Sequence, residues 1–390
     1  MSAFLLILEW LIVLAWSAMI LSTLLNIRHV PNLLDPKYAQ PLPPQALPLI
    51  SVIVPACNEE AHIEATLRAL LAIDSVPIHI FAVDDRSTDS TGGIMDRIAS
   101  ESRSRLTVIH ITDLPPGWMG KTHAMALAAR QAATPWLLFT DADVLFAPET
   151  LLRAVNLAQA ESADHLVLFP TMIFKSFGET MMVAVFQLFG TLASPPWRVA
   201  DPRTRDSIGI GAFNLIRADV YRAIGGFEAL RMQVVEDIRL GVEVKRAGYR
   251  QRVAFGPGLI RIRWAEGAFH FIRNVTKNFF AIFRFRARWA LIGCAALTIF
   301  SLGPFAGFAG PLRFRIPAAL LYLMLFLFYR LLSRLGGLSP AYFLTFPIAA
   351  ALLIFALLRS VIVTLLRGGI RWRGTFYPLA ELRKYSGPLR

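Results

Sequence analysis

The aspartates Asp141 and Asp143 follow an apolar run with the spacing of a divalent metal site. The run 136–143 (WLLFTDAD) has the composition of a buried strand, and alternation along a strand would turn both carboxylates to the same side. Hard oxygen ligands suit Mg²⁺ or Mn²⁺, which complete their coordination with phosphate oxygens and water. The pair therefore predicts a metal that stabilises a departing diphosphate, although a solvated turn or a helix cap would use the same residues.

Two further acidic pairs lie where a strand ends or a helix begins. Asp84 and Asp85 end the run 78–85 (IHIFAVDD), and Asp84 is a candidate to bind a nucleobase edge or a ribose hydroxyl. Glu236 and Asp237 precede a helical pattern, where Asp237 could take a proton from an acceptor hydroxyl as a general base. Acids at such positions also cap helices and favour the helix dipole, so both interpretations stay open.

Four strand-like runs would position these side chains. They cover 51–55, 78–85, 106–110 and 136–143, and helical patterns lie at 59–73, from 90 to about 99, and after Lys121. This alternation predicts an α/β fold with a mostly parallel sheet and helices on both faces. Because ligands of such sheets bind outside the carboxyl ends of the strands, the acidic pairs are expected along one edge of the sheet.

The order of these motifs resembles glycosyltransferase family 2, whose members have the Rossmann-like GT-A fold of nucleotide-diphospho-sugar transferases. The matching pieces are SVIVPACNE (51–59), VDDRSTD (83–89), GWMGK (117–121), DAD (141–143), GGF (225–227) and ED (236–237). Each piece is short, but six pieces in this order are specific, and together they span about residues 48–260.

The resemblance implies an inverting glycosyltransferase that uses a UDP- or GDP-linked sugar and Mg²⁺ or Mn²⁺. Asp143 together with Asp141 would hold the metal, Asp237 would be the catalytic base, and Glu236 would support it. Lys121 resembles the basic residue of the family near the nucleotide-sugar, although lysines are also common on protein surfaces. The implied nucleotide-sugar contacts are Pro55, Ala56, Asn58, Glu59, Asp84, Asp85, Lys121 and Asp141.

The chain departs from the family members that extend polymers, which carry Gln/Arg-x-x-Arg-Trp. Its Arg-Trp pairs at 263–264 and 288–289 have Ile260 and Phe285 at the position three before the arginine. The segment that begins at Trp264 instead resembles membrane-bound members linked to hopanoid and carotenoid lipids, which implies a lipid acceptor. A processive polysaccharide synthase and a non-catalytic, transferase-like scaffold remain as alternatives.

The composition points to a membrane. Hydrophobic residues make up 55% of the chain, charged residues only 17%, and the net charge is +13, with many of the arginines beside apolar runs. Basic residues so placed favour the bilayer surface, and no nucleic-acid-binding motif is present, so nucleic acid is not expected as a partner. The expected organisation is an N-terminal transmembrane anchor (1–28), a Pro-rich linker (29–48), the catalytic domain (49–260), an amphipathic interfacial segment (261–288), a C-terminal transmembrane bundle (289–366) and a basic tail (367–390).

The distribution of basic residues predicts a multi-pass protein of the cell (inner) membrane with its catalytic domain in the cytoplasm. No Lys or Arg precedes the first apolar run, whereas Arg28 and Lys37 follow it. Three C-terminal segments, near 290–310, 316–333 and 341–366, are long enough to span a bilayer. Three full crossings would put the basic tail outside, against the positive-inside rule, so one segment is expected not to cross fully.

Overall fold

A seven-stranded, mostly parallel sheet forms the centre of the catalytic half in this computed structural model, which describes residues 2–387. The strand order is β3-β2-β1-β4-β8-β6-β9, and only β8 runs antiparallel to its neighbours. Three of the four predicted strands are found close to their expected bounds, and the fourth, β4, ends four residues early; together they confirm the α/β fold. The bounds are β1 (Ile50–Ala56), β2 (Ile78–Asp85), β3 (Leu106–Ile111), β4 (Trp136–Phe139), β6 (His165–Leu168), β8 (Asn214–Arg217) and β9 (Gln251–Ala254).

Helices cover both faces of this sheet because its strands are apolar on both sides. Val52 and Val54 of β1 pack with Leu67 on one face, while Ile53 packs with the alanine-rich α4 on the other. The helices of this half are α2 (Ile63–Leu71), α3 (Thr91–Glu101), α4 (Gly120–Gln131), α5 (Thr150–Ala160), α7 (Ala218–Ala223), α8 (Gly226–Ala229) and α9 (Glu236–Arg246). A small sheet of β5 (Leu145–Phe146), β10 (Ile260–Ile262) and β7 (Thr171–Met172) lies beside the main one.

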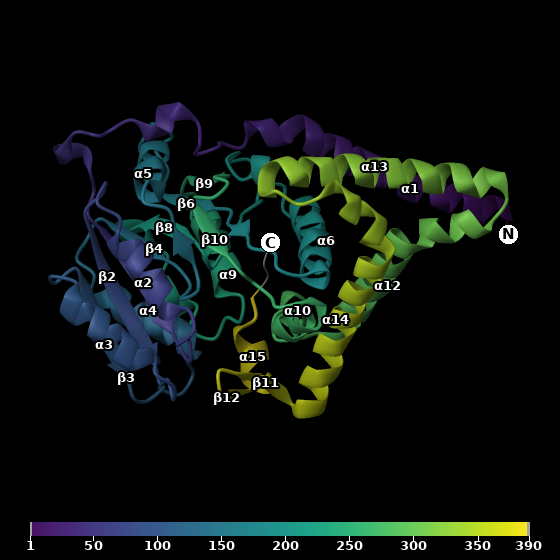
Figure 1. Cartoon of the computed structure of the whole chain (residues 1–390). Coiled ribbons are helices and arrows are strands. Elements are labelled where there is room, and N and C mark those ends of the chain that lie inside the picture. Colours follow the sequence, from purple (N-terminus) through teal and green to yellow (C-terminus); the bar gives the residue numbers. More distant parts are fainter. Residues whose placement is uncertain (1, 388–390) are drawn as a thin grey trace.

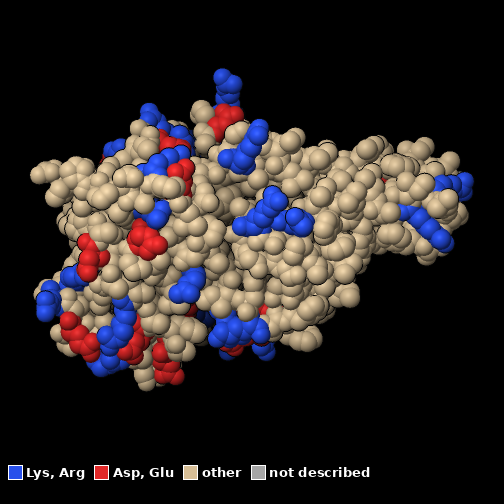
Figure 2. All heavy atoms as spheres, turned by 45° about the horizontal axis from the view of Figure 1, so that its top comes forward, with Lys and Arg blue, Asp and Glu red and all other residues tan. Residues whose placement is uncertain are grey.

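Five helices are long and apolar enough to cross a membrane, by length and composition, among the described residues. Four were expected: α1 (Ser2–Asn26), α12 (Ala287–Leu302) with the 3₁₀ turn η5 (Gly303–Ala309), α13 (Leu312–Gly336) and α14 (Phe346–Arg367). The fifth, α6 (Phe177–Ala193), was not expected. Figure 1 shows α1 beside α13 and α12 beside α14, and Figure 2 shows a broad surface without charged side chains over this helical part.

The Pro-rich segment 29–48 is docked on the catalytic half. It forms η1 (Ile27–His29), η2 (Pro36–Ala39) and η3 (Pro44–Ala46), and η2 contacts α5. Leu33 and Tyr38 are buried in the same core as β1, and the Leu33 amide donates a 2.7 Å hydrogen bond to the Phe255 carbonyl. This segment therefore fixes the end of α1 to the sheet and is packed against it, whereas a linker would only separate the two.

The segment expected to lie at the membrane interface packs against the apolar helices. It contains α10 (Ala268–Val275) and α11 (Phe279–Ile282). Phe271 and Ile272 are buried in a core shared with α6, α13 and α14, whereas Phe269 is 80% exposed. The helix is thus amphipathic, as predicted, with its buried face turned to protein.

The C-terminal segment after α14 is folded and returns to the catalytic half (Figure 1). It forms a hairpin of β11 (Gly369–Trp372) and β12 (Thr375–Pro378), followed by α15 (Leu379–Tyr385). The Gly120 amide at the start of α4 donates to the Tyr377 hydroxyl over 3.1 Å, and Arg231 donates to the Tyr385 hydroxyl over 2.7 Å. The residues expected to form a basic tail therefore lie against the predicted site.

Candidate active site

A buried ion triangle lies at the centre of the site. Lys121, in the first turn of α4, places its Nζ 2.6 Å from an Asp141 carboxylate oxygen and 2.6 Å from a Glu236 carboxylate oxygen. Burial alone would lower the pKa of the Lys121 ammonium, but the two carboxylates, with Asp237 nearby, raise it above its ordinary value. Lys121 in turn lowers the pKa of Asp141 despite its burial, so this lysine and this aspartate hold each other in their charged forms.

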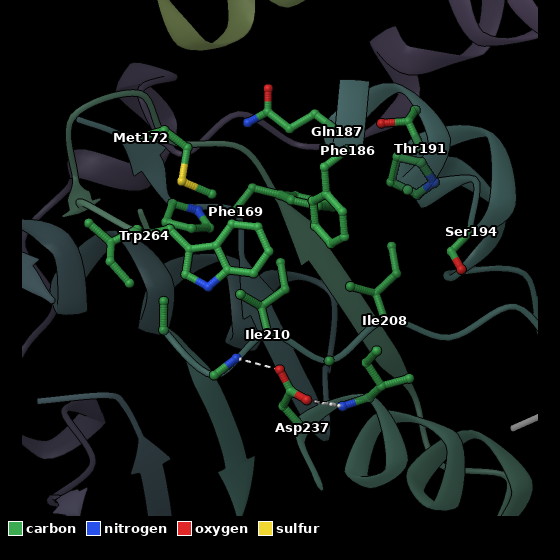
Figure 3. A pocket seen from close by; sticks show the side chains of 18 of the residues that line it. Phe169, Met172, Phe186, Gln187, Thr191, Ser194, Ile208, Ile210, Asp237 and Trp264 are labelled. Atoms are coloured by element: carbon green, nitrogen blue, oxygen red, sulfur yellow. Dashed lines mark hydrogen bonds between the residues drawn. The ribbon is translucent and has the colours of Figure 1, made fainter. Parts of the chain in front are cut away.

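The candidate base Asp237 is fixed by two backbone amides at the start of α9. One carboxylate oxygen accepts a 2.9 Å hydrogen bond from the Gly211 amide and the other a 2.8 Å bond from the Ile238 amide (Figure 3). Burial and the neighbouring Glu236 raise the pKa of Asp237 to about 6, against the opposing effect of Lys121. At neutral pH Asp237 is therefore a carboxylate of raised basicity, which suits a proton acceptor.

The glycines before β8 shape this site, and sequence analysis did not single them out. A methyl group on Gly211 would lie 2.5 Å from an Asp141 carboxylate oxygen and 3.3 Å from Lys121 Nζ, and one on Gly209 would overlap the Asp237 backbone carbonyl. Only glycine lets this segment approach both acids so closely. The Gly-x-Gly spacing at 209–211 is the sequence signal that could have identified it.

Asp141 and Asp143 do not occupy the strand positions expected of them. Strand β4 ends at Phe139, so both aspartates lie in the turn before β5, where alternation does not set their directions. Asp141 faces Lys121, whereas Asp143 makes no ion pair within the described residues. Burial, and then the charges of Asp141 and Glu59, raise the pKa of Asp143 to about 7. This turn therefore holds more negative charge than its protein partners neutralise.

The carboxyl end of β1 contributes backbone groups and one carboxylate, that of Glu59, to the acidic edge of the sheet. Pro55 and Ala56 are buried within the strand. Asn58, with a left-handed backbone (φ 57°), accepts a 2.8 Å hydrogen bond from the Thr88 amide and so ties this loop to the one after β2. Glu59 is partly exposed, and burial raises the pKa of its carboxyl.

The two aspartates at the end of β2 differ in their surroundings. Asp84 accepts a 3.1 Å hydrogen bond from the Ser87 amide and lies 3.1 Å from a ring nitrogen of His110. Asp85 is fully buried and forms a 2.8 Å ion pair with Arg86. Asp84 thus keeps a small exposed fraction at the edge, whereas Asp85 is completely covered.

Two cations from outside the predicted catalytic domain reach this site. Arg373, in the turn of the C-terminal hairpin, donates from Nη2 to a Glu59 carboxylate oxygen over 3.0 Å. Lys277, between α10 and α11, places its Nζ 4.2 Å from the centre of the Trp372 ring and 2.9 Å from the Asn278 side-chain oxygen. Burial lowers the pKa of Lys277 to about 8. No local pattern marked either residue as part of the site.

One cavity of about 460 Å³ joins the ion triangle to the apolar helices. Lys121, Asp141, Glu236 and Asp237 line one part of it. Apolar and aromatic side chains line the rest, and Figure 3 shows several of them gathered on one side of Asp237. They come from β7, α6, α13, the interfacial segment and the loop before β8, and they include Met172, Phe186, Ile208, Ile210, Trp264, Phe328, Leu332 and Leu335. The other predicted residues, Pro55, Ala56, Asn58, Glu59, Asp84, Asp85 and Asp143, lie outside this cavity, at the ends of β1, β2 and β4.

The ion triangle gives a testable prediction. Replacing Lys121 with Met keeps the length of the side chain but leaves Asp141 and Glu236 without their shared cation. We expect the free energy of unfolding to fall by about 3–5 kcal/mol, because an uncompensated buried charge is costly. Adding Glu236→Gln to the same chain should recover part of that loss. Denaturation of the detergent-purified variants measures both effects, and equal stability of Lys121→Met and wild type would rule out the triangle.

Comparison with known proteins places this site in a family. A family model described as "Glycosyltransferase like family 2" matches residues 45–291. The chain is 24% identical over 233 residues to the 4,4'-diaponeurosporenoate glycosyltransferase of Staphylococcus haemolyticus, covering 59% of this chain and 60% of that protein. It is 26% identical over 201 residues to the succinoglycan biosynthesis protein ExoA of Rhizobium meliloti, covering 51% of this chain and 58% of that protein.

The chain thus spans about three fifths of the length of these two curated relatives. Among solved structures, the mannosyltransferase PcManGT of Pyrobaculum calidifontis aligns with a TM-score of 0.47 and 19% identity, over 91% of this chain and 99% of that one. Because the family model covers well over half of the sequence and includes the whole acidic edge, the chain belongs to glycosyltransferase-like family 2.

Proposed function

We propose that this glycosyltransferase is bound to a membrane and transfers one sugar, with inversion, from a UDP- or GDP-linked donor to a hydroxyl of a lipid. The observation that carries the proposal is the cavity that joins Asp237 to side chains of α6 and α13. A carboxylate suited to accept a proton and an apolar passage are thus parts of one site. A water-soluble acceptor would not need such a passage.

The donor would bind along the acidic edge outside the ends of β1, β2 and β4, where ligands of open α/β sheets bind. Pro55, Ala56 and Asn58 would contribute backbone and loop contacts. Asp84 is the group available for a ribose hydroxyl or a base edge, and Asp85 would support the loop from below. Glu59, Lys121 and Asp141 would lie nearer the diphosphate.

A divalent metal, Mg²⁺ or Mn²⁺, fits the turn that contains Asp143. The carboxylates of Asp141 and Glu59 help to raise the pKa of Asp143, so a cation beside it would relieve repulsion. No group of three or more His, Cys, Asp or Glu side chains within residues 2–387 is placed to hold a metal. Asp143, with help from Asp141, would therefore share the metal with donor phosphates and water, and the metal would neutralise charge on the leaving diphosphate.

Asp237 would take the proton from the acceptor hydroxyl. Each of its oxygens already accepts one amide hydrogen bond, which fixes the carboxylate and leaves lone pairs toward the cavity. Glu236, held by Lys121, keeps a second negative charge nearby and so raises the basicity of Asp237. Attack from this side, opposite the departing diphosphate, gives a single displacement with inversion.

The two curated relatives do not decide the acceptor. One is named for 4,4'-diaponeurosporenoate and the other for succinoglycan biosynthesis, so a processive polysaccharide synthase remains an outcome that the assay below must exclude. The apolar lining of the cavity, with Trp264, Phe186 and Leu335, favours the lipid.

The chain path limits the membrane topology. The C-terminal hairpin docks on the catalytic half, so an even number of the helices between α11 and β11 would cross the bilayer. The segments before and after α6 also belong to the catalytic half, so α6 would not cross. We therefore propose three crossings, by α1, by α12 with η5, and by α13, which satisfy both limits and keep the basic C-terminal segment on the catalytic side.

This topology would put the catalytic half in the cytoplasm at the inner membrane, in line with the positive-inside rule. The basic residues flanking the helices on that side outnumber those at the far tip, where Arg313 and Arg315 lie in the first turn of α13. The flanking residues on the catalytic side include Arg28, Lys37, Arg284, Arg286, Arg288, Arg334, Arg367 and Arg371.

The experiment that tests this function is sugar transfer by detergent-purified protein. We would supply UDP- and GDP-sugars with Mn²⁺ or Mg²⁺ and a total lipid extract, and follow radiolabelled sugar into the lipid fraction. Label should reach a lipid with wild type and be lost with Asp237→Asn, with Asp143→Ala and with a chelator, each by about a hundredfold or more. Label in a growing polymer would contradict the proposal.

The dependence of transfer on pH tests the role of Asp237. The base must be unprotonated, and its pKa is raised to about 6, so activity should rise with pH through that value and level off above it. Below this range, kcat/KM for the acceptor should fall about tenfold per pH unit, measured at saturating metal and donor. A flat profile between about pH 5 and 8 would exclude Asp237 as the base.

A further inference from the structure

We propose that Arg373 and Lys277, which lie outside the sheet domain, bind the diphosphate of the nucleotide-sugar, so that the C-terminal hairpin completes the donor site. This assignment rests on the proposed function and extends it to residues that follow the catalytic domain. Its basis is the position of the hairpin, an unsatisfied guanidinium nitrogen of Arg373, a lysine without an ion pair and the backbone of the hairpin turn.

The hairpin is fixed at the edge where the donor would bind. Gly120, directly before Lys121, donates its amide hydrogen to the Tyr377 hydroxyl over 3.1 Å. Arg86, which follows the Asp84-Asp85 pair, donates to the Thr375 hydroxyl over 3.2 Å. Because both contacts lie on β12 and Arg373 itself donates to Glu59, the turn at 373–374 is held next to the residues that follow β1 and β2.

Arg373 has unused hydrogen-bonding capacity in this position. Its Nη2 is paired with Glu59, but its Nη1 is buried and makes no hydrogen bond within the described residues. Buried donors of a guanidinium are nearly always satisfied, and an arginine fork readily binds two oxygens at once. A phosphate oxygen beside Glu59 would satisfy Nη1.

Lys277 is a second cation without an acidic partner. Its Nζ contacts the Trp372 ring and the Asn278 side chain, and no carboxylate lies within ion-pair distance among the residues described. The acids whose charges act on Lys277 have other partners: Glu236 is paired with Lys121, and Asp237 accepts two backbone amide hydrogen bonds. Burial lowers its pKa to about 8, as expected for an ammonium that lacks a counter-ion. Lys277 and Trp372 both line the cavity that contains Asp141, so an anion bound there would meet this charge.

The backbone of the turn indicates that the arginine is retained for its side chain. Arg373 (φ 46°) and Gly374 (φ 80°) form a two-residue hairpin loop with both residues left-handed. Such loops favour Asn or Gly at the first position, and an arginine there carries a conformational cost. Asn at 373 would therefore suit the hairpin at least as well as Arg.

The Arg373→Asn variant therefore distinguishes a binding role of the arginine side chain from a structural role in the hairpin. We would measure the affinity of the full-length protein in nanodiscs for UDP and GDP, with Mn²⁺ present, by calorimetry. Arg373→Asn should leave the melting temperature unchanged or higher, yet weaken binding of the preferred diphosphate about tenfold to a hundredfold. Lys277→Met should weaken it to a similar extent, and Arg373→Lys should restore part of the loss.

Arg371→Gln is the matched control, because Arg371 lies on the same hairpin and is exposed. It should bind the diphosphate as wild type does. Unchanged affinity in both Arg373→Asn and Lys277→Met would overturn the inference while leaving the proposed function intact. Failure of wild type to bind either UDP or GDP would instead overturn the proposed function, and the inference with it.

Discussion

The contact of Lys121 with Asp141 and Glu236 is the interaction on which the rest of the site depends. It joins three elements: the start of α4, the turn after β4 and the start of α9. Like charges gathered at one edge would repel each other, and a buried lysine between two of them removes most of that repulsion. The acidic edge of the sheet and the apolar cavity therefore meet at this ion triangle, and Asp237 follows Glu236 directly in the chain.

Two further cations, Lys277 and Arg373, reach the site from parts of the chain that follow the sheet domain. The apolar helices hold them in place. Lys277 follows α10, whose buried face packs on α6 and α14. Arg373 lies in the turn between β11 and β12, and this hairpin follows α14. The hairpin then binds back to α4 through Tyr377. An isolated sheet domain would keep Asp143 and Asp237 but would lack both of these cations and much of the apolar cavity wall.

Much of the sheet could be predicted from the sequence, because its signals are local. The bounds of β2 agree with the apolar run 78–85, and the acids at strand ends do gather at one edge. The direction of Asp141 could not be predicted, since it depends on where β4 stops and on Lys121, which lies twenty positions earlier. Helix α6 could not be predicted as a candidate membrane helix, because its apolar run is short and includes Glu179.

The C-terminal hairpin also could not be predicted from local sequence patterns. Its strands have four residues each, and an Arg-Gly turn is not a usual hairpin signal. Its packing partners, such as Gly120, lie more than two hundred residues away. The basic residues of this segment indicated a membrane surface, whereas Arg373 contacts Glu59. The hairpin lies against the catalytic half, a position that the basic residues alone did not indicate.

The central claim is that the lipid acceptor reaches Asp237 through the cavity, and narrowing that cavity tests it most directly. Gly190 of α6 lines the cavity, and a side chain there meets open space. Gly190→Leu should leave nucleotide affinity unchanged but lower kcat/KM for the lipid at least about tenfold. The control is Gly93→Leu, at an exposed and equally open position on α3, which should change neither quantity. Full transfer to lipid by Gly190→Leu would contradict the account.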